Sequence, residues 1–373
     1  MSTFRQLMFG KRNRIKHYMD LTVVGSPTIS NGVVSGFSND NYLKLQQPFA
    51  PVGKWEVVIC TSTSTYNLAN SRYFFGCYGT GNIILGTTST THSFKAFIST
   101  NNGSSYNIQI TTTEEAVADT MYFIKLGFDG SKYYIEQSRD GETYTGRAEQ
   151  ASTDKISSAD VFIGKAYQDG YNWTKEINLN NSYIKLNNTK YQFRFAMPLT
   201  VVGSPTITDG VVSGFSANNY LTLPTINFSN INSWEFVFKV KMVDIYHAKY
   251  FFGNMSGNSI VVGNTDSPGG AFKIFLSSNG TSWDIGNMST NISNPANSIR
   301  YVRFGFTGTK YYVEQSSDGI TYTNKEELSS SDKLYSSQLY LGKAYQDSRY
   351  WQGNIDLNES FAIIDGTKYI FTL

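Results

Sequence analysis

The side chains that most often perform catalysis or bind metals are sparse and scattered in this sequence. The three histidines, His17, His92 and His247, lie far apart, and no cluster of cysteines or carboxylates accompanies them at the spacing of a metal site. The sequence also lacks a Gly-x-Ser-x-Gly elbow, the motif that exposes a nucleophilic serine. We therefore predict no catalytic residue, no metal site built on histidine, and a protein that is not an enzyme.

A duplicated aromatic loop is the best candidate for binding. It reads GKAYQDGYNW from Gly164 and GKAYQDSRYW from Gly342. Tyrosine and tryptophan rings offer flat apolar faces with polar rims, and Gln and Asp hydrogen-bond hydroxyl groups, a combination that suits a sugar. The predicted glycan-binding residues are Tyr167, Gln168, Asp169, Tyr171, Trp173, Tyr345, Gln346, Asp347, Tyr350 and Trp351. The alternative is that the two tryptophans begin a strand and pack inside the domain.

The N-terminal segment 1–20 differs in charge from the rest of the chain. It is rich in lysine and arginine and has one acidic residue, Asp20. It also has apolar side chains close to the basic ones, so we predict an arm that anchors the protein in a larger assembly. The predicted anchoring residues are Phe4, Leu7, Met8, Phe9, Lys11, Arg12, Arg14 and Lys16. The alternative is a frayed terminus.

The composition favours strands and turns over helices. Charged residues make up 16% of the 373 residues, and the formal net charge is +2, which gives no chain-wide basis for binding nucleic acid. No apolar run has the length of a secretion signal or a membrane span. The two cysteines, Cys60 and Cys77, stand where the second half of the chain has Lys239 and Asn254, so a disulfide is not part of the common design.

The sequence contains a long internal repeat. LTVVGSPTISNGVVSGF from Leu21 returns as LTVVGSPTITDGVVSGF from Leu199, and YFFG from Tyr73 returns from Tyr250. A repeat of about 178 residues is far longer than a solenoid unit, so each copy should be a whole domain. We predict an arm at 1–20, a first domain at 21–196 and a second at 197–373, with no flexible linker between the domains.

The local pattern within each copy predicts antiparallel strands. Trp55, Val57 and Ile59 alternate with Glu56, Val58 and Cys60, which predicts a strand with one buried face. Two alternating segments flank Asp129-Gly130, a pair that favours a tight hairpin turn. Many short strands with Gly, Asn and Asp turns, and no convincing amphipathic helix, predict an all-β chain of two tandem antiparallel β-sandwiches of jelly-roll type.

The order of these motifs resembles the concanavalin A-like lectin and glucanase family, which includes laminin G-like domains. The segments that carry the resemblance are the early strands WEVVI and WEFVF, the hairpins FDGSKYYIEQSRDG and FTGTKYYVEQSSDG, and the closing segments WTKEINLNNSYIKLNNTKY and WQGNIDLNESFAIIDGTKY. The last of these is also similar to modules of bacteriophage tail or head appendage proteins.

The resemblance implies two sites that can be checked against the residues. Glycan hydrolases of this fold use a Glu-x-Asp-x-x-Glu strand, whereas the second copy has Asn354, Asp356 and Glu359 there, and the first copy, which begins with Glu176, has Asn at the other two positions. Laminin G-like domains often hold Ca²⁺ at the rim, for which Asp169 and Asp347 are the candidate ligands, with a solvated turn carboxylate as the alternative. We expect no catalytic carboxylate pair and no other cofactor.

Two functions remain at this stage. The first is a non-enzymatic virion structural protein, a fibre, appendage or capsid decoration, made in the host cytoplasm and located in the virion. Its arm would bind other virion proteins and its lectin-like domains would bind host-surface glycans, as a homo-oligomer that neither binds nucleic acid nor inserts into a membrane. The second is a purely structural spacer or capsid-stabilising subunit that binds no glycan.

Overall fold

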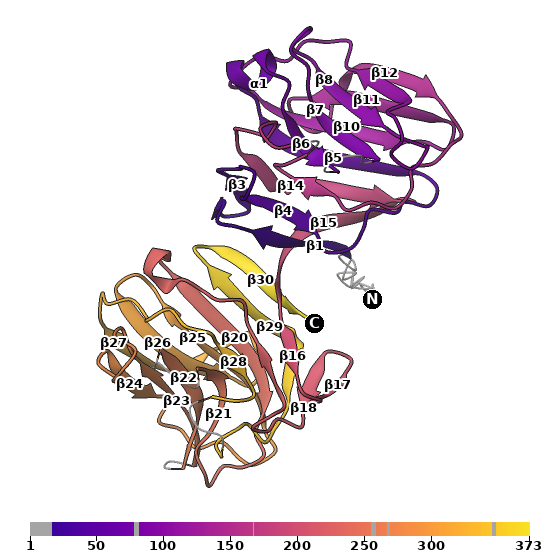
Figure 1. Ribbon diagram of the computed structural model, residues 1–373. Helices are drawn as coiled ribbons and strands as arrows, with labels where there is room; N and C mark the ends of the chain where they lie inside the picture. Colours follow the sequence, from indigo (N-terminus) through magenta and orange to yellow (C-terminus); the bar gives the residue numbers. More distant parts are fainter. Residues whose placement is uncertain (1–16, 78–81, 167, 255–258, 267–268, 345–347) are drawn as a thin grey trace, which may run out of the picture. The chain divides into compact units, whose positions relative to one another are not determined.

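The chain forms two compact units (Figure 1). The computed structural model describes residues 17–77, 82–166, 168–254, 259–266, 269–344 and 348–373. Of the described residues, one unit comprises 17–20 together with 35–193, and the other comprises 21–34 and 194–373. We call these units the first and the second domain. The repeat predicts the segment 21–34 as the start of the first domain, whereas proximity in space groups it with the second.

The first domain contains two antiparallel sheets. In one sheet, β5 lies between β10 and β14, and the order of strands is β12-β11-β10-β5-β14-β15. In the other, the order is β4-β13-β6-β7-β8-β9. The bounds are β4 (Tyr42–Leu45), β5 (Trp55–Ser62), β6 (Tyr73–Gly76), β7 (Ile83–Thr87), β8 (Phe94–Ile98), β9 (Ile108–Thr111), β10 (Met121–Phe128), β11 (Lys132–Ser138), β12 (Thr145–Ala151), β13 (Phe162–Ile163), β14 (Ile177–Leu186) and β15 (Thr189–Pro198).

The second domain repeats this arrangement. One sheet has the order β27-β26-β25-β20-β29-β30, and a 7-stranded sheet has the order β16-β19-β28-β21-β22-β23-β24. The bounds are β16 (Thr200–Val202), β19 (Tyr220–Thr222), β20 (Trp234–Lys241), β21 (Lys249–Gly253), β22 (Ile260–Asp266), β23 (Gly269–Leu276), β24 (Gly286–Ser289), β25 (Ile299–Phe306), β26 (Lys310–Ser316), β27 (Thr323–Ser329), β28 (Tyr340–Leu341), β29 (Ile355–Ile364) and β30 (Thr367–Thr372).

The remaining elements are β1, which has eight residues, and several short segments. A single turn of α-helix and a 3₁₀ turn are the helical elements of the described residues, in keeping with the predicted all-β class. The bounds are β1 (His17–Val24), β2 (Thr28–Ser30), β3 (Val33–Ser35), α1 (Thr65–Ala69), β17 (Thr206–Thr208), β18 (Val211–Ser213) and η1 (Phe228–Asn230). No helix in the described ranges is long and apolar enough to cross a membrane.

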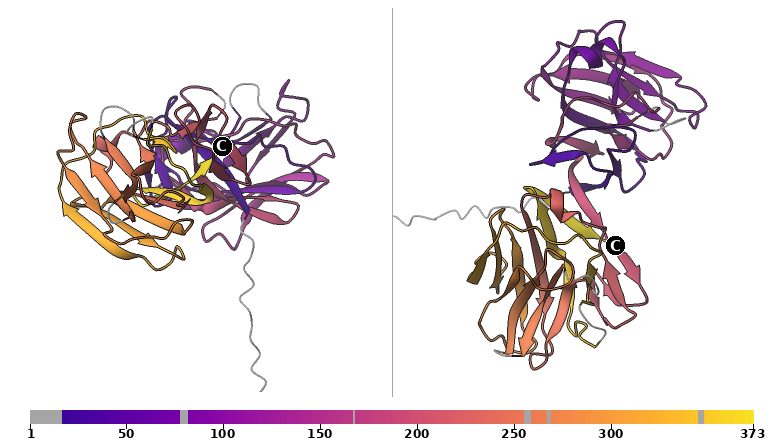
Figure 2. Two further views of the ribbon diagram at one scale, coloured as in Figure 1. Left: turned by 90° about the horizontal axis from the view of Figure 1, so that it is seen from below. Right: turned by 60° about the vertical axis from the view of Figure 1, so that its left-hand side comes forward.

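The core of each domain lies between its two sheets, as the layers in Figure 2 indicate. In the second domain, Trp234, Phe236 and Phe238 point from β20 into this core, and the Phe238 ring stacks on that of Phe371 with centroids 5.2 Å apart. The predicted antiparallel jelly-roll sandwiches are therefore confirmed.

The central strand β5 is buried more completely than its pattern predicts. Val58 and Cys60 lie on the face predicted to meet solvent, yet their exposed fractions are 0% and 1%. Tyr183 of β14 and Lys125 of β10 both pair with Val58, and Phe123 of β10 pairs with Cys60. Side chains at paired positions lie on the same face of a sheet, so these long neighbours cover the smaller ones. The prediction of a half-buried strand was wrong for this reason.

The hairpin after β10 forms at the predicted turn. Phe128 pairs with Tyr133 across it, and Gly130 has a φ of +104°. The Asp129 carboxylate accepts hydrogen bonds from the backbone N–H groups of Ser131 and Lys132, both at 2.8 Å. These bonds hold the pKa of Asp129 below its usual value. The Asp-Gly pair therefore forms the turn through both its backbone and its side chain.

Candidate functional site

Aromatic rings from four segments of the first domain meet on the sheet that contains β6, β7 and β8. Tyr73 lies in β6 and Phe97 in β8, and their rings meet edge to face with centroids 6.0 Å apart. Tyr171, from the predicted loop, stacks on Tyr73 at 5.8 Å, and Tyr106 meets Phe97 at 5.7 Å. We call Tyr73, Phe97, Tyr106 and Tyr171 the first platform.

Three rings of the first platform, those of Phe97, Tyr106 and Tyr171, are partly exposed at the surface. Tyr73 is 7% exposed, whereas the other three rings are partly buried against it and against the small cluster that it forms with Ile84 and Ala166. Such rings offer apolar faces on which the C–H groups of a sugar can pack.

The second domain builds a matching surface. Tyr250 of β21 lies near Phe275 of β23, with centroids 6.2 Å apart, and Phe275 lies 5.5 Å from Trp283. Arg349 completes the set by donating from Nη1 to the Tyr250 hydroxyl at 3.4 Å. We call Tyr250, Phe275, Trp283 and Arg349 the second platform. These residues, with Val261, line a pocket of about 140 Å³.

The same backbone hydrogen bond positions the loop residue in both domains. The N–H of Tyr73 donates to the carbonyl of Tyr171 at 3.0 Å, and that of Tyr250 donates to the carbonyl of Arg349 at 2.9 Å. Position 171 of the first domain therefore corresponds to position 349 of the second. The two platforms share their strand rings and differ in the loop side chain, a tyrosine in one and an arginine in the other.

Cations lie over the rings of both platforms. Lys95 lies over Phe97 and Lys273 over Phe275, with Nζ 4.5 Å and 4.8 Å from the ring centroids. The Arg72 guanidinium lies over Tyr171 at 5.7 Å. Cations at this range interact favourably with the ring faces and also provide hydrogen-bond donors at the rim. Each platform therefore combines apolar faces with polar edges.

The comparisons with known proteins give structural similarity alone. No protein-family model and no curated protein matches the chain. A crystal structure of the LG1-3 region of the laminin α2 chain aligns at 10% identity and TM-score 0.33, over 92% of this chain and 64% of that one, so the chain spans less than two thirds of its length. Domains LG4-5 of the mouse laminin α1 chain align at 9% identity and TM-score 0.32, over 95% of this chain and 93% of that one. The VIP36 exoplasmic/lumenal domain, in a Ca²⁺- and Man2-bound form, aligns at 9% identity and TM-score 0.32, over 42% of this chain and 78% of that one.

Each domain is an antiparallel β-sandwich. Its two antiparallel sheets, with the core between them, have this architecture in both copies.

Within the first sandwich, the structure brings some of the predicted binding residues to the surface. Gln168 and Asp169 are exposed and Tyr171 is partly exposed. The Asp169 carboxylate lies 3.3 Å from the Lys165 ammonium, which makes it an ion-pair partner. No group of three or more His, Cys, Asp or Glu side chains in the described ranges could hold a metal ion. Tyr167, Tyr345, Gln346 and Asp347 lie outside the described residues, and so do all the predicted anchoring residues of the arm.

The two tryptophans of the loop are core residues, which corrects their prediction as ligand contacts. Trp173 and Trp351 are 0% and 2% exposed. Their rings meet Phe74 and Phe251 edge to face, with centroids 4.9 Å and 5.3 Å apart. A large apolar ring gains more by leaving water than by staying at the rim. Tyr350 is partly exposed, and Lys249 lies over its ring at 5.7 Å.

The strand rings of the platforms were not predicted as site residues. Tyr73 and Tyr250 mark the repeat in the sequence, whereas Phe97, Tyr106 and Trp283 are not among the predicted site residues. One signal for the phenylalanines is present in the sequence. Lys-x-Phe occurs in β8 and again in β23, and strand alternation places each phenylalanine opposite the buried residues on either side of it.

The partial carboxylate set of the second domain is an ion-pair cluster. Lys239 of β20 contacts both Asp356, at 3.1 Å, and Glu359. The lysine and a hydrogen bond from Tyr301 hold the pKa of Glu359 below its usual value. A general acid for glycoside cleavage needs a raised pKa, so the shift has the wrong sign for that role. In the first domain Cys60 occupies the position of the lysine, and burial raises the pKa of its thiol to about 11.

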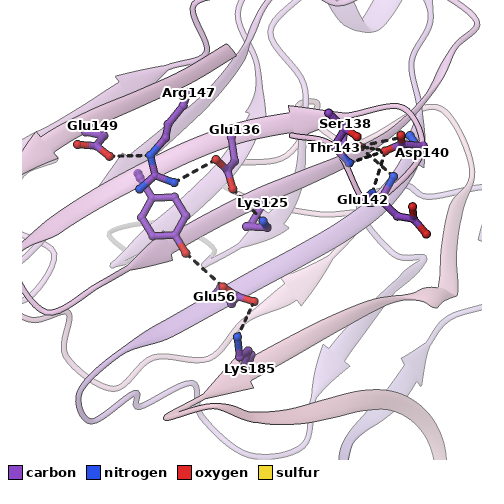
Figure 3. A network of polar contacts seen from close by, with 12 residues as sticks. Glu56, Lys125, Glu136, Ser138, Asp140, Glu142, Thr143, Arg147, Glu149 and Lys185 are labelled. Atoms are coloured by element: carbon purple, nitrogen blue, oxygen red, sulfur yellow. Dashed lines mark hydrogen bonds and ion pairs between the residues drawn. The ribbon is translucent and has the colours of Figure 1, made fainter. Parts of the chain in front are cut away.

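The outer face of the β5 sheet carries paired charges. Glu136 lies between Lys125, at 2.8 Å, and Arg147, at 3.0 Å, and Arg147 also contacts Glu149 at 2.6 Å (Figure 3). Because each of these charges already has an opposite partner, this face has less to offer a charged ligand than the platforms do.

Proposed function

We propose that this protein is a non-enzymatic glycan-binding protein whose two platforms hold sugars. The observation that carries the proposal is the duplication of the platform. Tyr73 and Tyr250 are buried at corresponding strand positions, and Phe97 and Phe275 lie next to them as partly exposed rings at corresponding positions of the two domains. Aromatic faces with a cationic and hydroxylated rim suit a sugar ring, which has apolar C–H faces and polar edges.

The proposal extends to a virion structural protein, a fibre, appendage or capsid decoration, located in the virion. Its support is the sequence of the segment 1–20, where basic and apolar side chains occur together. In this proposal the arm binds other virion proteins and the sandwiches present the platforms to host-surface glycans. The alternative is a structural spacer without glycan binding.

Binding at a single platform should be weak, because a shallow aromatic surface makes few contacts with a sugar. Linked sites gain roughly 10² to 10⁴ in avidity without any new contact. Two platforms on one chain therefore suit the recognition of a repetitive polysaccharide surface better than that of a single small sugar.

A glycan array with the full chain tests the proposal. We expect binding to at least one class of polysaccharide, and a loss of at least 10-fold when one outer ring of each platform is removed in the double variant Tyr106→Ala/Trp283→Ala. Ile320→Ser is the matched control, because Ile320 is 85% exposed and lies in the turn between β26 and β27, outside both platforms.

Three outcomes would contradict the proposal. The absence of any bound glycan favours the spacer, and unchanged binding in the double variant shows that the platforms are not the site. Release of reducing ends from a bound polysaccharide would show that the protein is an enzyme. We do not expect this result, because Asp356 and Glu359 of the second domain are ion-paired with Lys239.

A further inference from the structure

Corresponding positions of the two domains differ in one buried polar interaction. Gln315 in β26 and Gln137 in β11 correspond, since each pairs with the same position of the preceding strand, Val302 and Ile124. Both glutamines are at least nine-tenths buried, at 5% and 3% exposure. Both the oxygen and the nitrogen of the Gln315 amide are hydrogen-bonded, whereas the Gln137 Oε1 accepts no hydrogen bond from the described residues.

In the second domain the side chain of Asn294 forms hydrogen bonds with the Gln315 amide. Asn294 Nδ2 donates to Gln315 Oε1 at 2.9 Å, and Gln315 Nε2 donates back to Asn294 Oδ1 at 3.3 Å. This is a cyclic pair of two primary amides. Asn294 Nδ2 also donates to the carbonyl of Gly270 at 2.8 Å, and Arg300 Nε donates to Asn294 Oδ1 at 2.7 Å.

In the first domain an alanine stands at the position of that asparagine. Ala116 N donates to the carbonyl of His92 at 2.9 Å, as Asn294 N donates to Gly269 at 3.2 Å, so the backbone is held in the same way. The methyl group of Ala116 cannot donate to Gln137. A buried amide oxygen without a donor is unfavourable, which makes this position favourable for a ligand that supplies one.

A pocket of about 240 Å³ lies at this position of the first domain. Its lining includes Gln137, Tyr122, Glu115 and Arg139. The Tyr122 hydroxyl is held in place by the backbone N–H of Val117, at 2.9 Å. The polar lining and the size of the pocket suit a small ligand with several hydrogen-bonding groups.

The rim of the pocket carries charges that the second domain lacks. Glu114, Glu115 and Arg139 correspond in the repeat to Ile292, Ser293 and Ser317. The glutamates and the arginine are exposed, so they can meet a ligand that carries both a cation and an anion.

Asp140, a further acid at the rim, is already engaged in its own turn. Its carboxylate accepts hydrogen bonds from the backbone N–H groups of Glu142 and Thr143, both at 2.8 Å, and from the Ser138 hydroxyl at 2.7 Å (Figure 3). It therefore shapes the pocket wall and does not compete with a ligand for Arg139.

We infer that the first domain binds a primary carboxamide in this pocket, the side chain of asparagine or glutamine. The ligand amide pairs with Gln137 as Asn294 pairs with Gln315, and the glutamates and Arg139 bind the α-ammonium and α-carboxylate groups when the ligand is the free amino acid. The same side chain in a polypeptide supplies the amide without these charges. The inference stands apart from the platforms, because no platform residue lines the pocket.

Ligand-observed NMR and calorimetry with the full chain test this inference. The probes are L-asparagine and L-glutamine, with L-aspartate and L-glutamate as matched controls of similar shape, and N-acetyl-asparagine amide as the uncharged, peptide-like form. We expect the free amides to bind at least 10-fold more tightly than the acids, because a carboxylate has no N–H to offer Gln137 and the unpaired acceptor rejects it. The uncharged form distinguishes the free amino acid from a polypeptide side chain as the source of the amide. Weaker binding of this form than of the free amino acids shows that the rim charges contribute to binding, and equal binding shows that they do not.

Ala116→Asn is the decisive variant, because it installs the residue with which the second domain fills this position. It should abolish binding while the melting temperature stays within a few degrees. Gln137→Met should also abolish binding, whereas Gln315→Met, its counterpart in the second domain, should lower stability and leave binding unchanged. Equal binding of amides and acids, or amide binding that survives both first-domain variants in a folded protein, would overturn the inference.

Discussion

At the scale of single residues, the two loop tryptophans have the same burial but different hydrogen bonding. Trp173 Nε1 donates to the Thr61 hydroxyl at 2.7 Å, and this hydroxyl donates to the carbonyl of Glu176, also at 2.7 Å. In the second domain Val240 stands in the place of the threonine, and Trp351 Nε1 has no acceptor among the described residues. The buried indole N–H is therefore hydrogen-bonded in the first domain, whereas the corresponding N–H of the second domain has no acceptor among the described residues.

We predict opposite effects of exchanging these two residues. Thr61→Val should destabilise the protein by about 1–3 kcal/mol, because it leaves the Trp173 N–H without an acceptor. Val240→Thr should stabilise the protein by about 0.5–1.5 kcal/mol, because it gives the Trp351 N–H an acceptor. Urea unfolding followed by tryptophan fluorescence measures both. A destabilising Val240→Thr would show that the second core cannot accommodate a hydroxyl at this position.

The cluster around Lys239 makes a prediction about pH. The folded-state pKa of Glu359 is lowered by Lys239 and then by Tyr301, so its contribution to stability is present above the unfolded pKa and is lost as the pH falls through the folded one. Stability of the second domain should therefore decrease on acidification below about pH 4. Lys239→Met should raise the Glu359 pKa toward its usual value and weaken this dependence. NMR titration of the carboxyl carbon measures the shift, and an unchanged Glu359 pKa in the variant would refute the assignment.

At the scale of elements, the duplicated loop depends on its first glycine. Gly164 and Gly342 have φ values of +85° and +82°. A Cβ at either position would lie 1.9 Å from a ring carbon, of Phe37 in the first domain and Phe215 in the second. The glycine thus lets a ring pack on the loop just before the segment that carries Tyr171.

We predict that Gly164→Ala destabilises the first domain by more than about 2 kcal/mol, because strain in φ and a steric clash act together. Gly170→Ala is the matched control. Gly170 has a φ of +84° but no atom within 4 Å of an added Cβ, so it should cost about 1 kcal/mol from conformation alone. Thermal unfolding measures the two variants. Equal losses would show that the Phe37 ring moves aside at no cost.

At the scale of the whole molecule, the strand β1 begins inside the predicted arm. It starts at His17, and the Asp20 carbonyl accepts a hydrogen bond from Gln46 N at 2.9 Å. Residues 17–20 therefore belong to the folded protein, and a truncation that tests the anchor should end at residue 16.

Deletion of residues 1–16 should leave the melting temperature within about 2 °C, since it removes no described strand, and should reduce incorporation into particles. Replacing Lys11, Arg12, Arg14 and Lys16 with serine should weaken incorporation in a salt-sensitive way, because exposed charges are screened over about 8 Å at physiological ionic strength. Replacing Phe4 and Phe9 with serine should weaken it with little salt dependence. Normal incorporation of the truncated protein would exclude the anchor.

The sequence alone determined the class of this protein and its internal repeat. The alternation around Trp55, the Asp129-Gly130 turn and the return of YFFG at Tyr250 are local patterns, and local patterns are sufficient to identify strands, turns and duplicated units. The loop that carries Tyr171 was also found this way, because it is duplicated and aromatic.

Only the tertiary structure decided which side chains meet. Tyr73, Phe97 and Tyr106 are far apart in sequence, and strand pairing with loop closure places their rings together. Trp173 and Tyr171 are two residues apart in one loop, yet one is buried and the other reaches the surface. Burial depends on what packs against a residue from distant segments, and no local pattern contains that information. The Gln137 Oε1, which has no donor among the described residues, could not be predicted for the same reason, since it appears only when the packing of the two domains is compared.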